Sequence, residues 1–221
     1  MNNNVKIWND VYQAGNFLSH PTEVFIRMVL EQERHEGFPG IVLDHGCGSG
    51  VNAEFLIRRG HKVHCTEISE AALETVSRRF RYKDLPAPET SLIVPDQSLA
   101  SQISNFDHVV AWCSLLYNTP EVVQRNIAEL IENMSPGACF ICAFPTPNDL
   151  LAHSTETLPD GSRRLVQGHS GQMGIIVTLP ETEDQFVGWC KGIEIRDIGK
   201  YSITLGGLHS EHMAIYGTKP V

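Results

Sequence analysis

The segment "IVLDHGCGSGVNAEFL", residues 41–56, constrains the fold more than any other part of the chain. An apolar run ends at Asp44, the glycines Gly46, Gly48 and Gly50 follow, and an amphipathic run begins directly after them. Glycine carries a conformational cost, so alternate glycines mark a left-handed turn or backbone that must approach another group closely. The pattern predicts a buried strand, a ligand-binding turn and then a helix.

The rest of the chain repeats this alternation of apolar runs with amphipathic segments. Such alternation predicts an α/β fold, with a doubly wound, mostly parallel sheet and helices on both faces. Near the C-terminus, "GIEIRDIGKYSITL" and "EHMAIYGTK" have no helical pattern between them and predict an antiparallel hairpin. The expected parallel strands lie within residues 40–46, 61–68, 91–96, 106–112 and 137–144.

Length and charge narrow the class of protein. The 221 residues suit one domain, residues 1–221. The net charge of −9 argues against nucleic acid or an anionic membrane as a partner, because both attract basic surfaces. The N-terminus has no signal-peptide layout, no apolar run is long enough to span a bilayer, and the six cysteines lie in apolar stretches, so we expect reduced thiols and a cytoplasmic location.

A carboxylate at the end of the second expected strand indicates the kind of ligand. Glu67 follows "KVHCT", and a carboxylate there can accept hydrogen bonds from the 2′- and 3′-hydroxyls of a ribose. The dinucleotide fingerprint G-x-G-x-x-G/A, read from Gly46, fails at Val51. A ribose-containing ligand other than a nicotinamide or flavin dinucleotide is therefore expected.

At this point the chain resembles the class I S-adenosylmethionine-dependent methyltransferases. Five ordered motifs carry the resemblance: "VLDHGCGSG", Glu67 at the usual spacing, "IVPDQ", "FDHVVAWCSLLYN" and "LIENMSPGACFICAF". The resemblance implies a seven-stranded Rossmann-like sheet that ends in an antiparallel pair. It also implies S-adenosylmethionine as the cofactor and S-adenosylhomocysteine as its product.

The resemblance assigns residues to the cofactor site. It implies that the glycines let the backbone pass close to the methionine portion, that Asp44 accepts from the amino group, and that Ile68 packs on the adenine. His45 departs from the family, which more often has a small or aliphatic residue there. The cofactor-binding residues implied are Asp44, Gly46, Cys47, Gly48, Gly50, Glu67, Ile68, Asp96, Gln97, Trp112 and Cys113.

Acceptor contacts are expected outside these motifs. Residues 1–36 are expected to form a lid, and the polar residues 145–180 a substrate cap. Tyr12, His153 and His169 are the candidate catalytic residues in these segments. No metal site is expected, because the Cys and His pairs of "CFIC" and "HSEH" are three residues apart and point to opposite faces of a strand.

The motifs together predict methyl transfer to a small-molecule acceptor by in-line displacement. We expect no nucleic-acid or membrane partner, and we expect the protein to be a monomer or a homodimer. Two alternatives stay open: transfer of another group from the same cofactor, and a non-catalytic subunit that binds the cofactor. The sequence does not distinguish oxygen, nitrogen, carbon or sulfur as the methyl acceptor.

Overall fold

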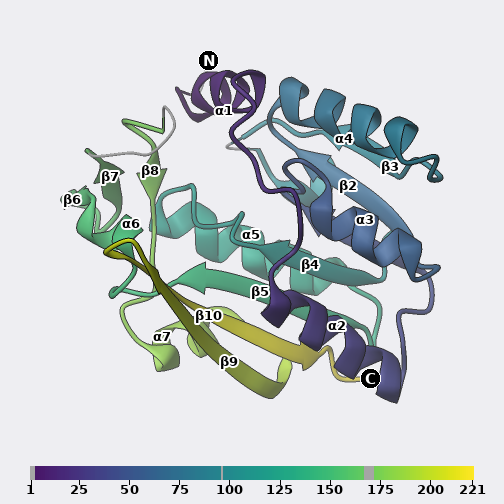
Figure 1. Cartoon of the computed structure of the whole chain (residues 1–221). Helices are drawn as coiled ribbons and strands as arrows, with labels where there is room; N and C mark the ends of the chain where they lie inside the picture. Colours follow the sequence, from purple (N-terminus) through teal and green to yellow (C-terminus); the bar gives the residue numbers. More distant parts are fainter. Residues whose placement is uncertain (1–2, 96, 167–171) are drawn as a thin grey trace.

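The computed structural model describes residues 3–95, 97–166 and 172–221 (Figure 1). Its helices are α1 (Asn3–Gln13), α2 (Glu23–His35), α3 (Val51–Arg58), α4 (Glu70–Tyr82), η1 (Leu99–Ser101, a 3₁₀ turn), α5 (Pro120–Asn133), α6 (Leu150–His153) and α7 (Glu183–Trp189). Its strands are β1 (Ile41–His45), β2 (Lys62–Glu67), β3 (Glu89–Leu92), β4 (His108–Trp112), β5 (Cys139–Pro145), β6 (Thr155–Thr157), β7 (Arg163–Leu165), β8 (Ile176–Val177), β9 (Glu194–Leu205) and β10 (Leu208–Thr218).

One sheet of seven strands organises the chain, in the order β3-β2-β1-β4-β5-β10-β9. The first five strands of this order pair in parallel, whereas β10 pairs antiparallel with β5 and with β9. This confirms the predicted mostly parallel sheet with a C-terminal antiparallel hairpin. The order reverses between β1 and β4, which is the place where open α/β sheets bind ligands.

Helices cover both faces of this sheet, which explains why the strands are continuous apolar runs. Helices α2, α3 and α4 pack on one face with Val42, Cys139 and Ile141, and α5 and α7 pack on the other with Leu43 and Phe140. Residues next to each other in a strand thus pack in different hydrophobic clusters, one on each face of the sheet. Cys139 and Cys142 are likewise separated by the sheet, and all six cysteines are free thiols.

Helix starts largely follow the sequence signals. The Ser69 hydroxyl accepts a hydrogen bond from the Ala72 N–H and caps α4, as serine commonly does at helix starts. Helix α5 begins with Pro120 in its first turn, where proline is favoured, but the side chain of Thr119 makes no capping hydrogen bond. No described helix is long and apolar enough to cross a membrane.

The polar segment after β5 contains secondary structure that the sequence pattern did not reveal. Helix α6 and a separate antiparallel sheet, β6-β7-β8, occupy it. These elements are two to four residues long, too short to show a periodic pattern. Together with α1, the small sheet lies beyond the carboxyl ends of the parallel strands (Figure 1).

Gly217 provides a test of the packing between β9 and β10. A Cβ on Gly217 would lie 2.5 Å from the Glu194 carbonyl oxygen and 2.6 Å from Ile193 Cγ2. Because backbone cannot yield easily, we expect Gly217→Ala to lower the free energy of unfolding by about 1–3 kcal/mol in urea titrations. Gly188→Ala is the control: its Cβ in α7 meets nothing within 4 Å, so it should be stabilising by about 0.5–1 kcal/mol. Equal stability of the two variants would contradict this packing.

Candidate functional site

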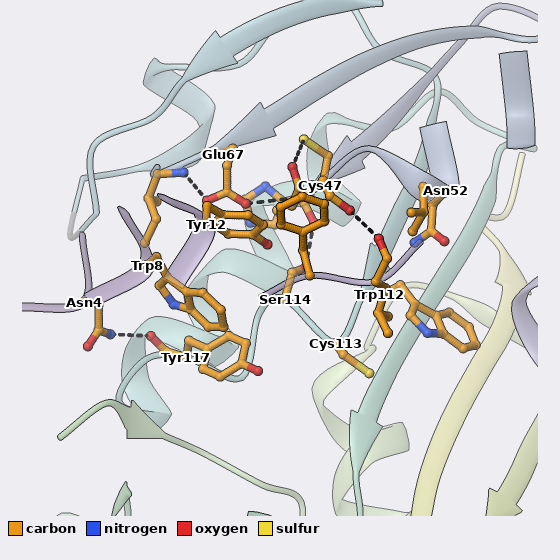
Figure 2. A pocket seen from close by; sticks show the side chains of 18 of the residues that line it. Asn4, Trp8, Tyr12, Cys47, Asn52, Glu67, Trp112, Cys113, Ser114 and Tyr117 are labelled. Atoms are coloured by element: carbon orange, nitrogen blue, oxygen red, sulfur yellow. Dashed lines mark hydrogen bonds between the residues drawn. The ribbon is translucent and has the colours of Figure 1, made fainter. Parts of the chain in front are cut away.

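A cavity of about 510 Å³ opens at the carboxyl ends of β1, β2 and β4. Helix α1 and the hairpin β9–β10 contribute to its walls. Figure 2 shows Tyr12, Glu67 and Cys47 gathered on one side, Trp112 and Cys113 on another, and Trp8 against Tyr117. A volume of this size is typical of sites for small molecules.

The glycine turn forms one wall, and its backbone conformation requires glycine. Gly46, Gly48 and Gly50 have φ values of 65°, 55° and 75°, in the left-handed region. A Cβ on Gly46 would clash with Ser114, and one on Gly48 with the Tyr12 hydroxyl. Other groups do approach the backbone of this turn closely, as the glycines predicted. In this structure these groups are the side chains of Ser114 and Tyr12.

The three glycines are not equivalent. Gly46 and Gly48 line the cavity, whereas Gly50 does not. Gly50 precedes α3, and a Cβ there would lie 3.0 Å from Val76 Cγ2 of α4. Gly50 thus lets the start of α3 pack closely against α4.

The buried Glu67 carboxylate joins the glycine turn to the turn that follows β2. Its Oε2 accepts from the Gly48 N–H at 3.1 Å, and its Oε1 accepts from the N–H groups of Ile68 and Ser69 at 2.7 and 3.1 Å. A carboxylate offers about four acceptor positions, so about one remains, on the side of Oε2. This capacity suits one ribose hydroxyl better than the two expected from the sequence. Burial raises the pKa of Glu67, although these backbone donors oppose the shift.

Asp44 is a second buried carboxylate nearby, 1% exposed and outside the cavity lining. Within the described chain its Oδ2 has no hydrogen-bond partner. Burial raises the pKa of Asp44 to about 7, opposed by the Ala53 backbone donor and assisted by the charge of Glu67. An orphaned oxygen beside a second carboxylate favours a ligand that brings a donor and positive charge.

An apolar wall completes the cofactor end of the cavity. Ile68, Ile93 and Leu99 line it, together with Gln97. Such a surface suits a flat aromatic ring, and the predicted adenine contact of Ile68 stays a prediction. The predicted Asp96 lies outside the described residues.

His45, the departure from the family pattern, lines the cavity beside the glycine turn. Its Nδ1 lies 3.1 Å from the Thr66 hydroxyl. Burial lowers the pKa of His45 to about 4, so the ring is neutral at physiological pH. His45 therefore adds no charge to this wall.

The end of β4 leads into an aromatic chamber. Trp112 stacks against Tyr201 with ring centroids 6.2 Å apart, and Tyr201 stacks on His212 at 5.1 Å. Cys113 has a φ of 52°, an unusual value for a residue other than glycine, and burial raises its pKa to about 12. The predicted cofactor residues Trp112 and Cys113 thus lie where the cofactor end meets this chamber.

The three predicted catalytic residues have different placements. Tyr12 lines the cavity, but at Gly48 and Glu67, and burial together with the Glu67 charge raises its pKa well above 10. This position suits a lid better than a base. His153 is exposed on α6 and is not part of the lining, and His169 lies outside the described residues.

Sequence reasoning missed the chamber residues Ser114, Tyr117, Tyr201 and His212. One signal was available: β10 runs antiparallel to β5, so its first residues return to the carboxyl edge of the sheet. The described residues contain no group of three or more His, Cys, Asp or Glu side chains arranged to hold a metal ion.

The raised pKa of Asp44 predicts a pH dependence of stability. The folded-state pKa of about 7 exceeds the ordinary value of 3.8, so its contribution to stability is complete below about 3.8 and is lost as pH rises through 7. Asp44→Asn should reduce the fall in unfolding free energy between pH 5 and 7 by about 1 kcal/mol per pH unit.

Chemical denaturation at each pH measures these unfolding free energies, and Asp107→Asn is the control variant. Hydrogen bonds from Ser135 and Ile41 lower the Asp107 pKa, so its contribution is present above the ordinary value and is lost only at lower pH. The slope between pH 5 and 7 should therefore stay as in the wild type. A wild-type slope in Asp44→Asn would show that Asp44 does not titrate in this range.

Comparisons with known proteins agree with this geometry. Residues 42–137 match the family model described as a methyltransferase domain. A SAM-dependent methyltransferase from Methanosarcina mazei is 20% identical with a TM-score of 0.69, covering 91% of this chain and 99% of that one. Among curated proteins, no sequence matches the chain significantly.

Two further solved structures share the fold. A magnesium protoporphyrin IX methyltransferase from Synechocystis with bound SAH is 16% identical, with a TM-score of 0.62 and coverage of 96% and 97%. A (4+2)-cyclase is 15% identical, with a TM-score of 0.64 and coverage of 98% and 93%. The SAH bound in the Synechocystis structure is the product form of the cofactor that the motifs predict for this chain. Residues 42–137 match a methyltransferase domain, and the chain has the fold of the class I S-adenosylmethionine-dependent methyltransferases that its motifs predicted.

Proposed function

We propose that this chain binds S-adenosylmethionine at the glycine turn and transfers its methyl group to a small-molecule acceptor. The observation that carries the proposal is the continuity of the cavity. One space of about 510 Å³ joins the glycine turn and Glu67 to the chamber around Trp112 and Tyr201. A cofactor at the turn and an acceptor in the chamber would share a single enclosure.

Each part of the cofactor has a matching group in the chain. Asp44 and Glu67 supply negative charge for the amino group and an acceptor position for a ribose hydroxyl. Ile68, Ile93 and Leu99 supply an apolar wall for the adenine. The bound cofactor supplies a methyl group already activated for displacement. The chain has to align the acceptor and exclude water, and alignment alone can contribute about 7–11 kcal/mol.

The lid and cap assignments support a small acceptor. Trp8 packs edge-on against Tyr117 at 4.7 Å, and the Asn4 amide donates to the Tyr117 carbonyl oxygen at 2.9 Å. These contacts bring α1 over the cavity. Of the predicted lid, residues 1–36, helix α2 packs in the core instead, so we infer that the part before α2 acts as the lid. We infer that residues 145–180 act as the cap of the single domain, with Gln172 in the cavity lining.

Calorimetric titration with S-adenosylhomocysteine tests cofactor binding, with NADH as the control ligand. We expect micromolar binding of the former alone. Because Asp44 takes up a proton near pH 7, affinity should weaken by up to about fivefold between pH 7 and 6. Asp44→Asn should bind more weakly, with little pH dependence.

Adenosine is the matched control for Asp44, because it keeps the adenine and ribose but lacks the amino group. Its affinity should be nearly equal in the wild type and in Asp44→Asn, at both pH values. An equal loss of affinity for adenosine would assign the effect to a damaged fold. An unchanged affinity for S-adenosylhomocysteine would remove Asp44 from the site.

Turnover separates methyl transfer from its two alternatives. The protein is incubated with S-adenosylmethionine and a low-molecular-weight filtrate of cell extract, and in parallel with the macromolecular retentate. We expect S-adenosylhomocysteine to form with the filtrate. Formation of methylthioadenosine in its place would indicate transfer of another group. Formation of S-adenosylhomocysteine with the retentate alone would contradict a small acceptor. If neither compound forms, a non-catalytic subunit is favoured.

A further inference from the structure

His212 lies in the acceptor chamber and has no role in the cofactor site. In the sheet register it lies opposite Pro145 at the end of β5 and opposite Tyr201 in β9. Both His212 and Tyr201 line the cavity, as does Trp112 from β4. The hairpin thus returns a histidine to the carboxyl edge of the sheet, where the acceptor is proposed to bind.

A hydrogen-bond chain orients the His212 ring. Asp149, at the N-terminus of α6, accepts from the Ser210 hydroxyl at 3.0 Å and from the Glu211 N–H at 2.8 Å. The Ser210 oxygen lies 3.4 Å from His212 Nδ1. Because the Ser210 proton is given to Asp149, Nδ1–H is the donor in this last contact. This assignment leaves Nε2 as the acceptor nitrogen, and Nε2 makes no hydrogen bond within the described chain.

Stacking holds this ring in place, and burial keeps it neutral. The Tyr201 ring stacks on it with an interplanar angle of 10°. The titratable groups that face it are Asp149 from the start of α6, Glu211 from β10 and Tyr201 from β9. Burial lowers the pKa of His212, and the charges of Asp149 and Glu211 oppose the shift. The ring is therefore an unprotonated base at neutral pH.

The cavity wall also limits the charge of the acceptor. Among the described lining residues there is no lysine or arginine, and Glu67 contributes a carboxylate. An anionic acceptor would be buried here without a counter-charge, which is costly. The stacked rings of Trp112 and Tyr201 favour a flat, uncharged molecule.

We propose that His212 is the general base of the proposed methyl transfer, positioned by Ser210 and Asp149, and that the acceptor is an uncharged aromatic compound with a hydroxyl group. This inference rests on the proposed function. The hydroxyl oxygen bonds to the methyl carbon as the carbon–sulfur bond breaks with its electron pair passing to sulfur. The hydroxyl proton passes to Nε2 of His212, and Asp149 stabilises the resulting imidazolium through Ser210 before the proton is released to water.

Binding of 2-naphthol and of 6-hydroxy-2-naphthoate tests the acceptor class, with the protein saturated with S-adenosylhomocysteine. Calorimetry should show 2-naphthol binding at least about tenfold more tightly than the carboxylate, because the cavity offers no counter-charge. Failure of 2-naphthol to bind, or tighter binding of the carboxylate, overturns this part. Failure of S-adenosylhomocysteine itself to bind would instead refute the proposed function.

Methylation of 2-naphthol tests the base. At saturating S-adenosylmethionine, which removes the effect of Asp44 on affinity, wild-type kcat should rise with pH through a midpoint below 6.5, where His212 loses its proton. His212→Gln should lose at least about 100-fold in kcat and lose this rising limb, with KM for 2-naphthol and affinity for S-adenosylhomocysteine nearly unchanged. Absence of wild-type turnover, or a variant with the wild-type kcat and pH profile, overturns the proposal.

Two further variants separate the base from a structural role. His209→Gln changes a histidine on the same strand that does not line the cavity, and it should keep the wild-type profile. Ser210→Ala should lower kcat and move the pH midpoint while KM stays constant, and Ser210→Thr should restore both. A Ser210→Ala variant with an unmoved midpoint would overturn the positioning role.

Discussion

The carboxylate of Glu67 fixes the part of the structure on which the site depends. Its two oxygens hold the backbone of the glycine turn and of the turn before α4, so these two segments keep one relative position. Asp44 adds a second buried carboxylate with an unpartnered oxygen. The fold thus buries two carboxylates close together, and the described cavity lining holds no lysine or arginine to balance them, which favours a cationic ligand at that place.

The two ends of the cavity differ in charge because they come from different parts of the sheet. The cofactor end is built from turns after β1 and β2, where backbone N–H groups and carboxylates meet. The chamber is built from the end of β4 and the hairpin, whose side chains are aromatic or neutral. Antiparallel addition of β10 beside β5 makes this possible, because it brings residues from far along the chain to the same edge.

The sequence predicted those site residues whose positions follow from a local pattern of strand and turn. Asp44 and Glu67 end apolar runs, and parallel strands place such ends along one edge, so their proximity could be inferred. Tyr201 and His212 could not be assigned in this way, because their position depends on the register between β9, β10 and β5. Tyr12 shows the same limit: the glycines indicated close approach, but only tertiary packing decides that the Tyr12 hydroxyl meets Gly48.

One side of helix α1 packs in the hydrophobic core, and another side lines the cavity. Ile7 and Val11 are buried in the core, whereas Asn4, Trp8 and Tyr12, spaced four residues apart, line the cavity from the chamber to the glycine turn. These three side chains face the cavity from one stripe of the helix, so they can change without altering any strand. Related chains could exchange acceptors by variation in the first dozen or so residues alone, while the sheet and its cofactor turn stay constant.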